Sequence, residues 1–178
     1  MKIYYNNING FNSKKQSLIK IVDEVNPDII ALCETKRAQA VRQKKVVIPG
    51  YKTIERNLKQ GKEGLMVGAK LGSFLDIEDV TNNTFTNILT VRIKYKMVNM
   101  RIITLHAPQE TEKLEERSDF FDEIATQVER GVNAGDTLVV LGDFNARIYP
   151  NDIPGVSASS NGKLLRELLS EYELKIGS

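Results

Sequence analysis

Two short apolar runs, each reaching an acidic residue, constrain the fold of this chain more than any other feature. The stretch DIIALCE (28–34) is apolar almost throughout, as expected for a strand that is buried on both faces of a sheet. The stretch DTLVVLGDFN (136–145) has the same character and runs into a polar loop. Strands of this kind are typical of α/β proteins, in which ligands often bind at strand ends because loops converge there. We therefore expect an α/β fold with polar groups at the ends of its strands.

Strand-like and helix-like segments alternate along the rest of the chain. Runs rich in β-branched and aromatic residues predict further strands at 2–8, 51–57, 64–70, 86–96 and 98–107. Apolar residues at helical spacing predict helices at 13–26, at 111–131 and from Asn161-Gly162 onward. We expect Asn12 or Ser13 to cap the first helix, and Leu114 to lie on the inner face of the second. The pattern favours much antiparallel sheet flanked by helices.

Length and composition describe the class of protein. A chain of 178 residues fits one domain over residues 1–178, and its 41% hydrophobic and 27% charged residues are typical of a soluble globular protein. No apolar run approaches the length of a membrane span, and the start MKIYYNNING does not resemble a signal peptide. Cys33 is the only cysteine, which excludes an internal disulfide and suits a reducing compartment. These features predict an intracellular protein, cytoplasmic or nuclear, that is not secreted and has no membrane partner.

Basic residues gather after the ALCET stretch, among them Lys36, Arg37 and Arg42. The formal net charge of +2 is too small to identify a partner. The simpler interpretation of each residue is a solvated surface position. A basic rim beside a site would instead favour phosphate backbones, and we expect backbone contact from this cluster.

Polar side chains follow four of the strand-like runs. YYNNING carries Asn7 and Asn9, IIALCETK carries Glu34, RIITLHAPQE carries His106, and VVLGDFNARI carries Asp143 and Asn145. If these strands are neighbours, their ends meet at one edge of the fold. Carboxylates are hard oxygen ligands that suit Mg²⁺ or Mn²⁺, and amides orient water or phosphate without adding charge. The set suits phosphodiester cleavage, although each residue alone is equally compatible with a turn or a surface position.

These motifs resemble the endonuclease/exonuclease/phosphatase superfamily. NING, LCETK and GDFNARI, in this order, look most like the apurinic-type endonuclease domain of non-LTR (LINE-type) retrotransposons, and SSNGKLLRELL adds to the likeness. The resemblance runs from residue 2 to about residue 175. It implies a four-layer α/β sandwich, in which two mainly antiparallel sheets are flanked by helices. It also implies Mg²⁺-dependent (or Mn²⁺-dependent) hydrolysis of a phosphodiester in DNA, by which a retroelement nicks its target.

The resemblance implies a role for each polar residue. Glu34 looks like the metal ligand, with Asn7 supporting it and the phosphate. Asn9 occupies a position at the metal site that holds Asp or Asn in relatives. Asp143 resembles the carboxylate that orients or activates the attacking water, and Asn145 resembles the amide that contacts the scissile phosphate.

His106 is the only histidine in the chain, and histidine is a common proton carrier in hydrolytic enzymes. It stands in LHAP, where many relatives have tyrosine in a Y-x-P stretch and pancreatic deoxyribonuclease has a histidine. The resemblance implies that His106 donates a hydrogen bond to the phosphate or assists the leaving group. A structural histidine at a strand end is the alternative. By the same resemblance, Asn161 is expected to contact nucleic acid.

The C-terminal Ser-Asp-His stretch of the family has no counterpart in this sequence, which also has no tryptophan. We therefore expect a domain whose C-terminal strands are missing and whose sheet has an open edge. A dimer or a complementing chain would cover that edge. Two alternatives to an active DNA endonuclease stay open. One is a non-catalytic remnant of the same fold that binds nucleic acid or a partner, and the other is a phosphatase of the same superfamily.

Overall fold

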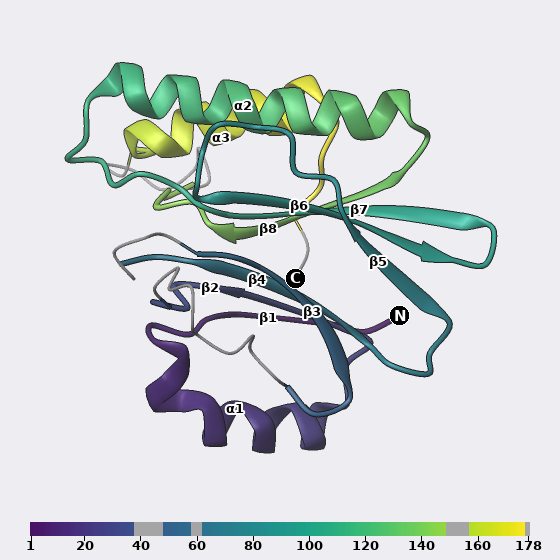
Figure 1. Cartoon of the computed structure of the whole chain (residues 1–178). Helices are drawn as coiled ribbons and strands as arrows, with labels where there is room; N and C mark the ends of the chain where they lie inside the picture. The colour runs from purple at the N-terminus through teal and green to yellow at the C-terminus, as the bar shows by residue number, and fades with distance from the viewer. Residues whose placement is uncertain (38–47, 58–61, 149–156, 177–178) are drawn as a thin grey trace.

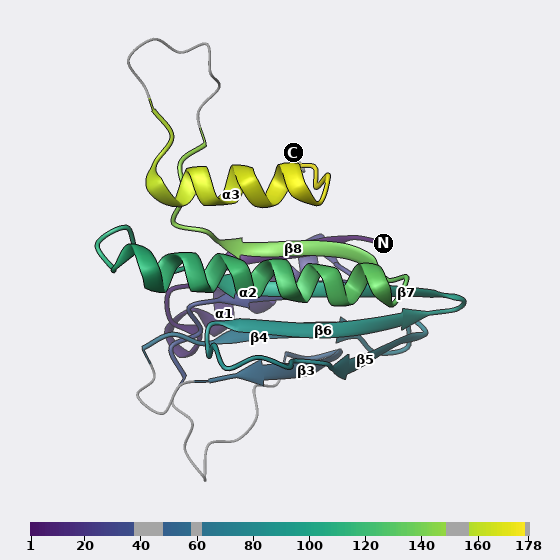
Figure 2. The same cartoon turned by 90° about the horizontal axis from the view of Figure 1, so that it is seen from above.

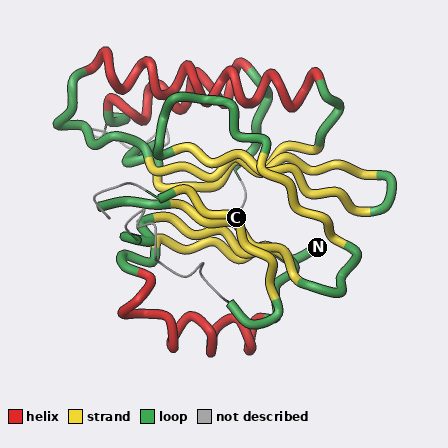
Figure 3. The backbone as a smooth tube through the Cα atoms, viewed as in Figure 1, coloured by secondary structure: helices red, strands yellow, loops and turns green. Residues whose placement is uncertain are grey.

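The computed structural model describes residues 1–37, 48–57, 62–148 and 157–176. These ranges contain two sheets and three helices arranged as a four-layer sandwich, as the sequence predicts (Figure 1). The two sheets lie face to face, α1 covers the outer face of one, and α2 and α3 cover the outer face of the other (Figures 1 and 3). None of these helices combines the length and the apolar character that a membrane span requires.

The first sheet has the strand order β1-β2-β4-β3. Its strands are β1 (Ile3–Asn7), β2 (Ile29–Cys33), β3 (Tyr51–Arg56) and β4 (Leu65–Lys70). β1 and β2 pair in parallel, and the other pairs are antiparallel. Every residue of β2 is buried, which confirms the prediction for this apolar run. Ile29, Ala31 and Cys33 face the second sheet, whereas Ile30 and Leu32 face α1 (Phe11–Val25), because alternate residues of a strand point to opposite faces.

The second sheet has the strand order β5-β6-β7-β8. Its strands are β5 (Leu75–Asp79), β6 (Ile88–Tyr95), β7 (Val98–His106) and β8 (Thr137–Asp143). Only β7 and β8 pair in parallel. The sequence did not predict β5, because its LDIED segment is an edge strand in which only Ile77 is buried, and it has no apolar run. α2 (Leu114–Asn133) and α3 (Ser160–Glu171) pack on this sheet around the aromatic pair Phe120 and Phe121.

Two predicted details of the helices are wrong. α1 begins at Phe11 after Gly10, without a side-chain cap, so Asn12 and Ser13 lie inside the helix. Leu114 is 59% exposed, because it is the first residue of α2 and precedes the turn that packs on the sheet. The last helix does begin at the predicted place, where the Ser159 side chain accepts a hydrogen bond from the Gly162 N–H.

The two parallel strand pairs determine where the polar residues gather. In parallel pairs the carboxyl ends of both strands lie at the same edge, so Asn7 ends beside Cys33, and His106 ends beside Asp143. β1 and β8 are each the outermost strand of their sheet on this side, and they contact one another across the sandwich. The ends of four strands from two sheets therefore meet at one point.

Candidate active site

Glu34 and Asp143 are held together by the amide of Asn7. Asn7 Nδ2 donates to Glu34 Oε1 at 2.7 Å and to Asp143 Oδ2 at 3.1 Å. The orientation of this amide is set from its other end, because Asn7 Oδ1 accepts the backbone N–H of Asn9 at 3.2 Å. One neutral side chain thus spans residues from both sheets and keeps two carboxylates close without neutralising either.

The backbone turns sharply directly after the strands that carry these residues. Asn9, Glu34, Lys36 and Asn145 all have positive φ angles, of 46°, 51°, 50° and 45° respectively. Asparagine tolerates this left-handed conformation, whereas for glutamate and lysine it costs free energy of order 1 kcal/mol or more each. Sharp turns of this kind direct the polar side chains toward the shared edge instead of continuing each strand past it.

His106 completes a cluster with the two carboxylates. Its Nε2 lies 3.5 Å from Glu34 Oε1, and its side chain is 14% exposed. The backbone of His106 is bonded on both sides to Asn87: its N–H donates to Asn87 O at 3.1 Å, and its carbonyl accepts from Asn87 Nδ2 at 2.8 Å. Sequence reasoning missed Asn87, because nothing in its local pattern distinguishes it from an ordinary loop residue.

Glu34, His106 and Asp143 each offer a ligand atom, and these atoms all lie within 4.8 Å of one another. A cluster of two carboxylates and an imidazole, partly buried and aimed at one point, fits a divalent cation. The donors to Asp143 support this fit, because Asn7 Nδ2 and the backbone N–H of Asn145 (3.0 Å to Oδ1) are both uncharged. The Asp143 carboxylate therefore keeps its negative charge available.

Glu34 is ionised at neutral pH. Partial burial on its own raises the pKa of this carboxyl, but the hydrogen bonds from Asn7 and Lys36 and the charges of His106 and Lys36 outweigh burial and lower the pKa below its ordinary value. The stability that these contacts contribute is present above the ordinary pKa of glutamate and is lost as the pH falls through the lowered pKa. The cluster thus presents a charged oxygen ligand throughout the physiological range.

Lys36 joins the two residues that the sequence assigned to the metal. Its Nζ lies 3.2 Å from Glu34 Oε2 and donates a short hydrogen bond to Asn9 Oδ1. Asn9 is therefore beside the cluster, but its side-chain oxygen is already occupied by an ammonium group. The Lys36 side chain is 40% exposed, so this lysine also faces solvent at the rim of the site.

Asn145 is fixed in place by the chain around it. Its Nδ2 donates to the carbonyl of Ala107 at 2.7 Å, which ties the loop after β8 to the residue that follows β7. Its backbone N–H reaches Asp143, as described above. The structure brings Asn145 to the cluster, with its amide turned toward a protein carbonyl.

The Asn161 side chain is fully buried, which does not agree with the predicted contact to nucleic acid. Its Nδ2 donates to three carbonyl oxygens, those of Pro108 (2.9 Å), Asn145 (3.2 Å) and Phe144 (3.3 Å). Its Oδ1 accepts from Arg117 Nη1 at 3.0 Å. Asn161 thus holds the loops that follow β7 and β8 and leaves no side-chain polar group for DNA.

Arg37 is also turned inward. Its side chain is 9% exposed, its Nε lies 3.3 Å from Glu55 Oε2, its Nη1 donates to Asn12 at 3.1 Å, and its guanidinium stacks over Phe11. Burial beside a carboxylate makes it a structural arginine, so the predicted backbone contact does not fit this conformation. Arg42 lies outside the described residues, and its predicted contact stays a prediction.

Tyr5 and Cys33 lie next to the two carboxylates, in the layer between the sheets. Tyr5 Oη and Cys33 Sγ lie 3.0 Å apart. Burial raises the pKa of the Cys33 thiol to about 11, and burial together with the Cys33 contact raises the pKa of Tyr5. Both groups are therefore neutral, so the negative charge is confined to the carboxylates above them.

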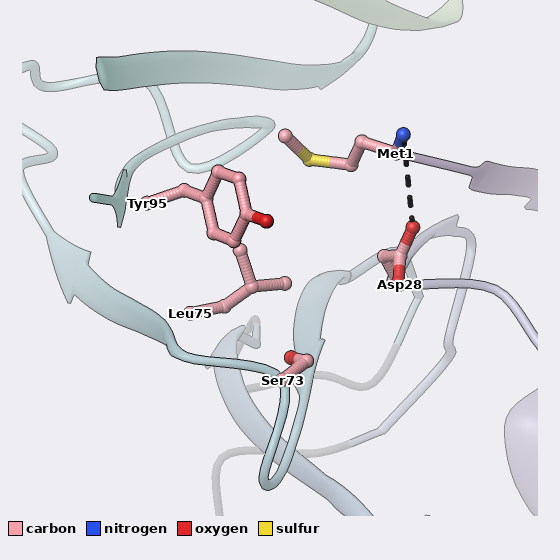
Figure 4. A pocket seen from close by; sticks show the side chains of 5 residues that line it. All are labelled: Met1, Asp28, Ser73, Leu75 and Tyr95. Atoms are coloured by element: carbon pink, nitrogen blue, oxygen red, sulfur yellow. Dashed lines mark ion pairs between the residues drawn. The ribbon is translucent and has the colours of Figure 1, made fainter. Parts of the chain in front are cut away.

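A small pocket lies at the other end of β1. It has a volume of about 130 Å³ and is lined by Met1, Asp28, Ser73, Leu75 and Tyr95 (Figure 4). The amino group of Met1 lies 4.0 Å from Asp28 Oδ2, the ion pair drawn in Figure 4. Because β1 runs from this pocket to Asn7, the pocket is separated from the carboxylate cluster by the length of the strand.

The sequence matches the model of the endonuclease/exonuclease/phosphatase family over residues 7–165. The match spans most of the chain and includes all three members of the cluster. The chain therefore belongs to the endonuclease/exonuclease/phosphatase family, a group of phosphoester hydrolases. A search of curated protein sequences found no match.

Solved structures agree with the fold. An AP endonuclease from Leishmania major superposes with a TM-score of 0.78 at 14% identity, covering 96% of this chain and 66% of that one. A 3′ phosphatase (NExo) from Neisseria, bound to a product DNA hairpin, gives 0.73 at 19% identity, with coverage of 96% and 70%. The endonuclease domain of TRAS1, a telomere-specific non-LTR retrotransposon, gives 0.65 at 14% identity, also with 96% and 70%. The chain thus spans about two thirds of the length of these structures.

Proposed function

We propose that this protein is a divalent-metal-dependent DNA endonuclease that hydrolyses a phosphodiester bond, using Mg²⁺ or Mn²⁺. The observation that carries the proposal is the convergence of Glu34 and Asp143 from two sheets onto one point, bridged by Asn7. Family membership supports the reaction class, because nucleases and phosphatases of this family act on phosphate esters.

Each residue has a part in the proposed reaction. Glu34 would hold the metal ion, and a bound divalent ion would supply positive charge to offset the negative charge that develops on the phosphate oxygens. Asp143 accepts a proton from the attacking water and orients it toward phosphorus. Asn7 positions both carboxylates. Asn145 contacts the scissile phosphate through the second N–H of its amide, since the first donates to the Ala107 carbonyl.

DNA is the proposed substrate. The AP endonuclease and the DNA-bound phosphatase among the similar structures support this class of substrate, and the TRAS1 domain supports a retroelement endonuclease that nicks its target. The partly exposed ammonium of Lys36 beside Glu34 supports a contact with a backbone phosphate. A DNA-processing role implies an intracellular site of action, in the cytoplasm or the nucleus.

The outer edge of β8 is the proposed place for a complementing chain or a second copy. Among the described strands, β8 pairs only with β7, and its apolar residues are half-buried where those of β7 are buried. α3 extends past this edge (Figure 2), and a hollow of about 740 Å³ lies between them, lined by Leu138 and Val140 of β8 and Leu165 and Leu168 of α3. An added strand would form backbone hydrogen bonds with β8 and would pack its apolar side chains against those of α3.

The experiment that tests the proposed activity is nicking of supercoiled plasmid with and without Mg²⁺. We expect metal-dependent nicking that falls at least about 100-fold in Asp143→Asn, because both the carboxylate charge and the proton acceptor are lost. Asp119→Asn makes the same chemical change on the exposed face of α2 and is the matched control. Nicking that survives in Asp143→Asn contradicts the proposed role of this residue.

Two other functions of the same fold give different results in the same assay. A non-catalytic remnant would bind DNA without nicking it under any metal. A phosphatase, as in the Neisseria structure, would release phosphate from 3′-phosphorylated DNA or a small phosphoester and leave plasmid intact. We favour the endonuclease, because the retained carboxylates argue against a decayed remnant and the NING and LCETK motifs resemble endonuclease domains more than phosphatases.

A further inference from the structure

The position of His106 relative to Glu34 differs from that of a hydrogen-bonded pair. The distance of 3.5 Å from Nε2 to Oε1 is at the outer limit for a hydrogen bond. Two donors that each lie about 2.1 Å from one ion are about 3 Å apart at the right angles of an octahedral site and about 3.4 Å apart at tetrahedral angles. The imidazole and the carboxylate are therefore separated about as two adjacent ligands of one ion would be.

The register of the second sheet supplies the third donor. His106 and Asp143 are directly paired residues of the parallel strands β7 and β8, and Asn87 holds the His106 backbone from the other side. The ligand atoms of all three residues lie within 4.8 Å of each other. The imidazole is thus placed by sheet pairing, which is more rigid than a loop.

The other ring nitrogen gives an independent observation. Nδ1 of His106 is buried and has no hydrogen-bond partner among the described residues. If Nε2–H donated to Glu34, the Nδ1 lone pair would be unmatched, and if Nδ1 carried the proton, that proton would be unmatched. The surrounding protein therefore selects neither tautomer, and a group bound at Nε2 would decide between them.

The groups that surround the cluster leave this position open to a cation. Glu34 Oε1 accepts one hydrogen bond from Asn7, and Oε2 pairs with Lys36. Each carboxylate oxygen has a further lone pair that could bind a cation. The Lys36 ammonium repels a second cation, which weakens binding of every metal alike and does not discriminate between them.

We propose that His106 Nε2 is a ligand of the metal ion, together with Glu34 and Asp143, and that it makes the site prefer Mn²⁺ and Zn²⁺ over Mg²⁺. Imidazole nitrogen suits transition metals and zinc, whereas Mg²⁺ strongly prefers oxygen and keeps several waters. The proposal rests on the proposed function in that the carboxylate cluster binds a cation, and it adds Asp143 to the ligands. A carboxylate that binds the ion keeps lone pairs with which it accepts the proton of a water bound beside it. It gives His106 a role in holding the metal instead of the phosphate.

The single histidine makes a direct test simple. In protein prepared without a polyhistidine tag, every imidazole signal in a ¹H–¹⁵N spectrum belongs to His106. On titration with Zn²⁺ we expect the Nε2 resonance to shift, with the proton located on Nδ1. Saturation with Zn²⁺ that leaves the Nε2 resonance unmoved overturns the proposal, as does a failure of the protein to bind Zn²⁺.

Selectivity is the second measurement. Mn²⁺ affinity is read from the electron paramagnetic resonance of the free ion, and Mg²⁺ affinity from competition against Mn²⁺. We expect His106→Asn to lower Mn²⁺ affinity at least about tenfold and to change Mg²⁺ affinity by less than about twofold. Glu34→Gln, the matched change at an oxygen ligand, should weaken both ions. An unchanged Mn²⁺ to Mg²⁺ ratio in His106→Asn, with a thermal midpoint like that of the parent, overturns the proposal.

The outcomes separate this proposal from the proposed nuclease activity. If the protein nicks plasmid but the ratio of Mn²⁺ to Mg²⁺ affinity is unchanged in His106→Asn, the proposed ligand role of His106 is wrong and the proposed nuclease activity stands. If the metal preference depends on His106 but no ion supports nicking, the proposed nuclease activity is wrong and the proposed ligand role of His106 stands.

Discussion

β8 begins and ends beside an aspartate, and the two aspartates have opposite surroundings. Asp136, just before the strand, has a fully buried side chain whose Oδ2 lies 2.9 Å from Arg101 Nε and 3.3 Å from Arg92 Nε. Within the described part of the chain, Asp143, at the far end, accepts hydrogen bonds from the uncharged N–H donors of Asn7 and Asn145. The first carboxylate is neutralised by the protein itself, and the second is not. The partners of an aspartate, more than its burial, indicate whether it is available to a cation.

Removing the buried charge should give the largest loss of stability. We expect Asp136→Ala to lower the free energy of unfolding by about 3–5 kcal/mol, because two arginines lose their shared partner and Arg101 is itself buried. Urea denaturation followed by circular dichroism measures this loss. A loss below about 1 kcal/mol would mean that solvent reaches the arginines and that the contrast between the two aspartates is weaker than their contacts indicate.

Asp143→Asn, at the other end of β8, should change stability only when a metal ion is bound. Without metal, we expect Asp143→Asn to alter the free energy of unfolding by less than about 0.5 kcal/mol. At a Mn²⁺ concentration of 100 times the dissociation constant, the parent should gain about 2.7 kcal/mol, and the variant should lose this gain. Thermal denaturation with and without Mn²⁺ provides the comparison. An equal metal-induced shift in both proteins would contradict a role for Asp143 in binding.

A smaller loss of stability should follow from adding a methyl group at Gly131, close to the contact between Arg101 and Asp136. A Cβ at Gly131 of α2 would lie 2.3 Å from Leu138 Cδ2 and 2.9 Å from Arg101 Cδ. We expect Gly131→Ala to cost about 1–3 kcal/mol of stability by displacing Arg101 from Asp136, with metal affinity unchanged. Gly135, where an added Cβ meets nothing within 4 Å, does not serve as a control because its φ is +68°. Ala134→Ser, at the exposed C-cap of α2, is a milder control.

The smallest effect should be on the rate at which Cys33, buried next to Tyr5 below the carboxylates, is alkylated. Burial raises the pKa of Cys33 to about 11, so the thiol is almost entirely protonated at pH 8. Because Cys33 is fully buried, deprotonation alone does not expose it to iodoacetamide. At pH 8 we expect alkylation to occur mainly through unfolding, and therefore faster in Asp136→Ala than in Asp143→Asn. Rapid labelling of the folded parent at pH 8 would show that Cys33 is accessible.

The sequence predicts the layers and the converging polar ends because both depend on local patterns. The continuous apolar run of β2 indicates burial on both faces, and the polar residues that end β1, β7 and β8 are visible in the letters. β5 was missed because an exposed edge strand needs no apolar run, and the alternation in LDIED is too short to distinguish from a loop. Edge strands are defined by their neighbours more than by their composition.

The residues that differ from prediction at the site do so because of distant partners. Arg37 follows the LCET motif on a stretch rich in basic residues, yet Glu55 and Phe11 draw it inward. Asn161 opens α3, where an exposed helix start is the ordinary expectation, yet carbonyls from the loops after β7 and β8 surround its amide. Neither contact leaves a signal near the residue itself, so pattern reasoning has no means to detect it.

The hydrogen bond from Asn7 to Asp143 joins residues 136 positions apart in the chain. A connection of such length closes late, because the intervening loop loses much conformational entropy before the contact forms. During synthesis, β1 and β2 emerge and can pair long before β8 exists, so a growing chain displays Glu34 without its partner carboxylate. Metal affinity should therefore develop only when both sheets have docked. Timed addition of Mn²⁺ during refolding would then report the final docking step of this protein.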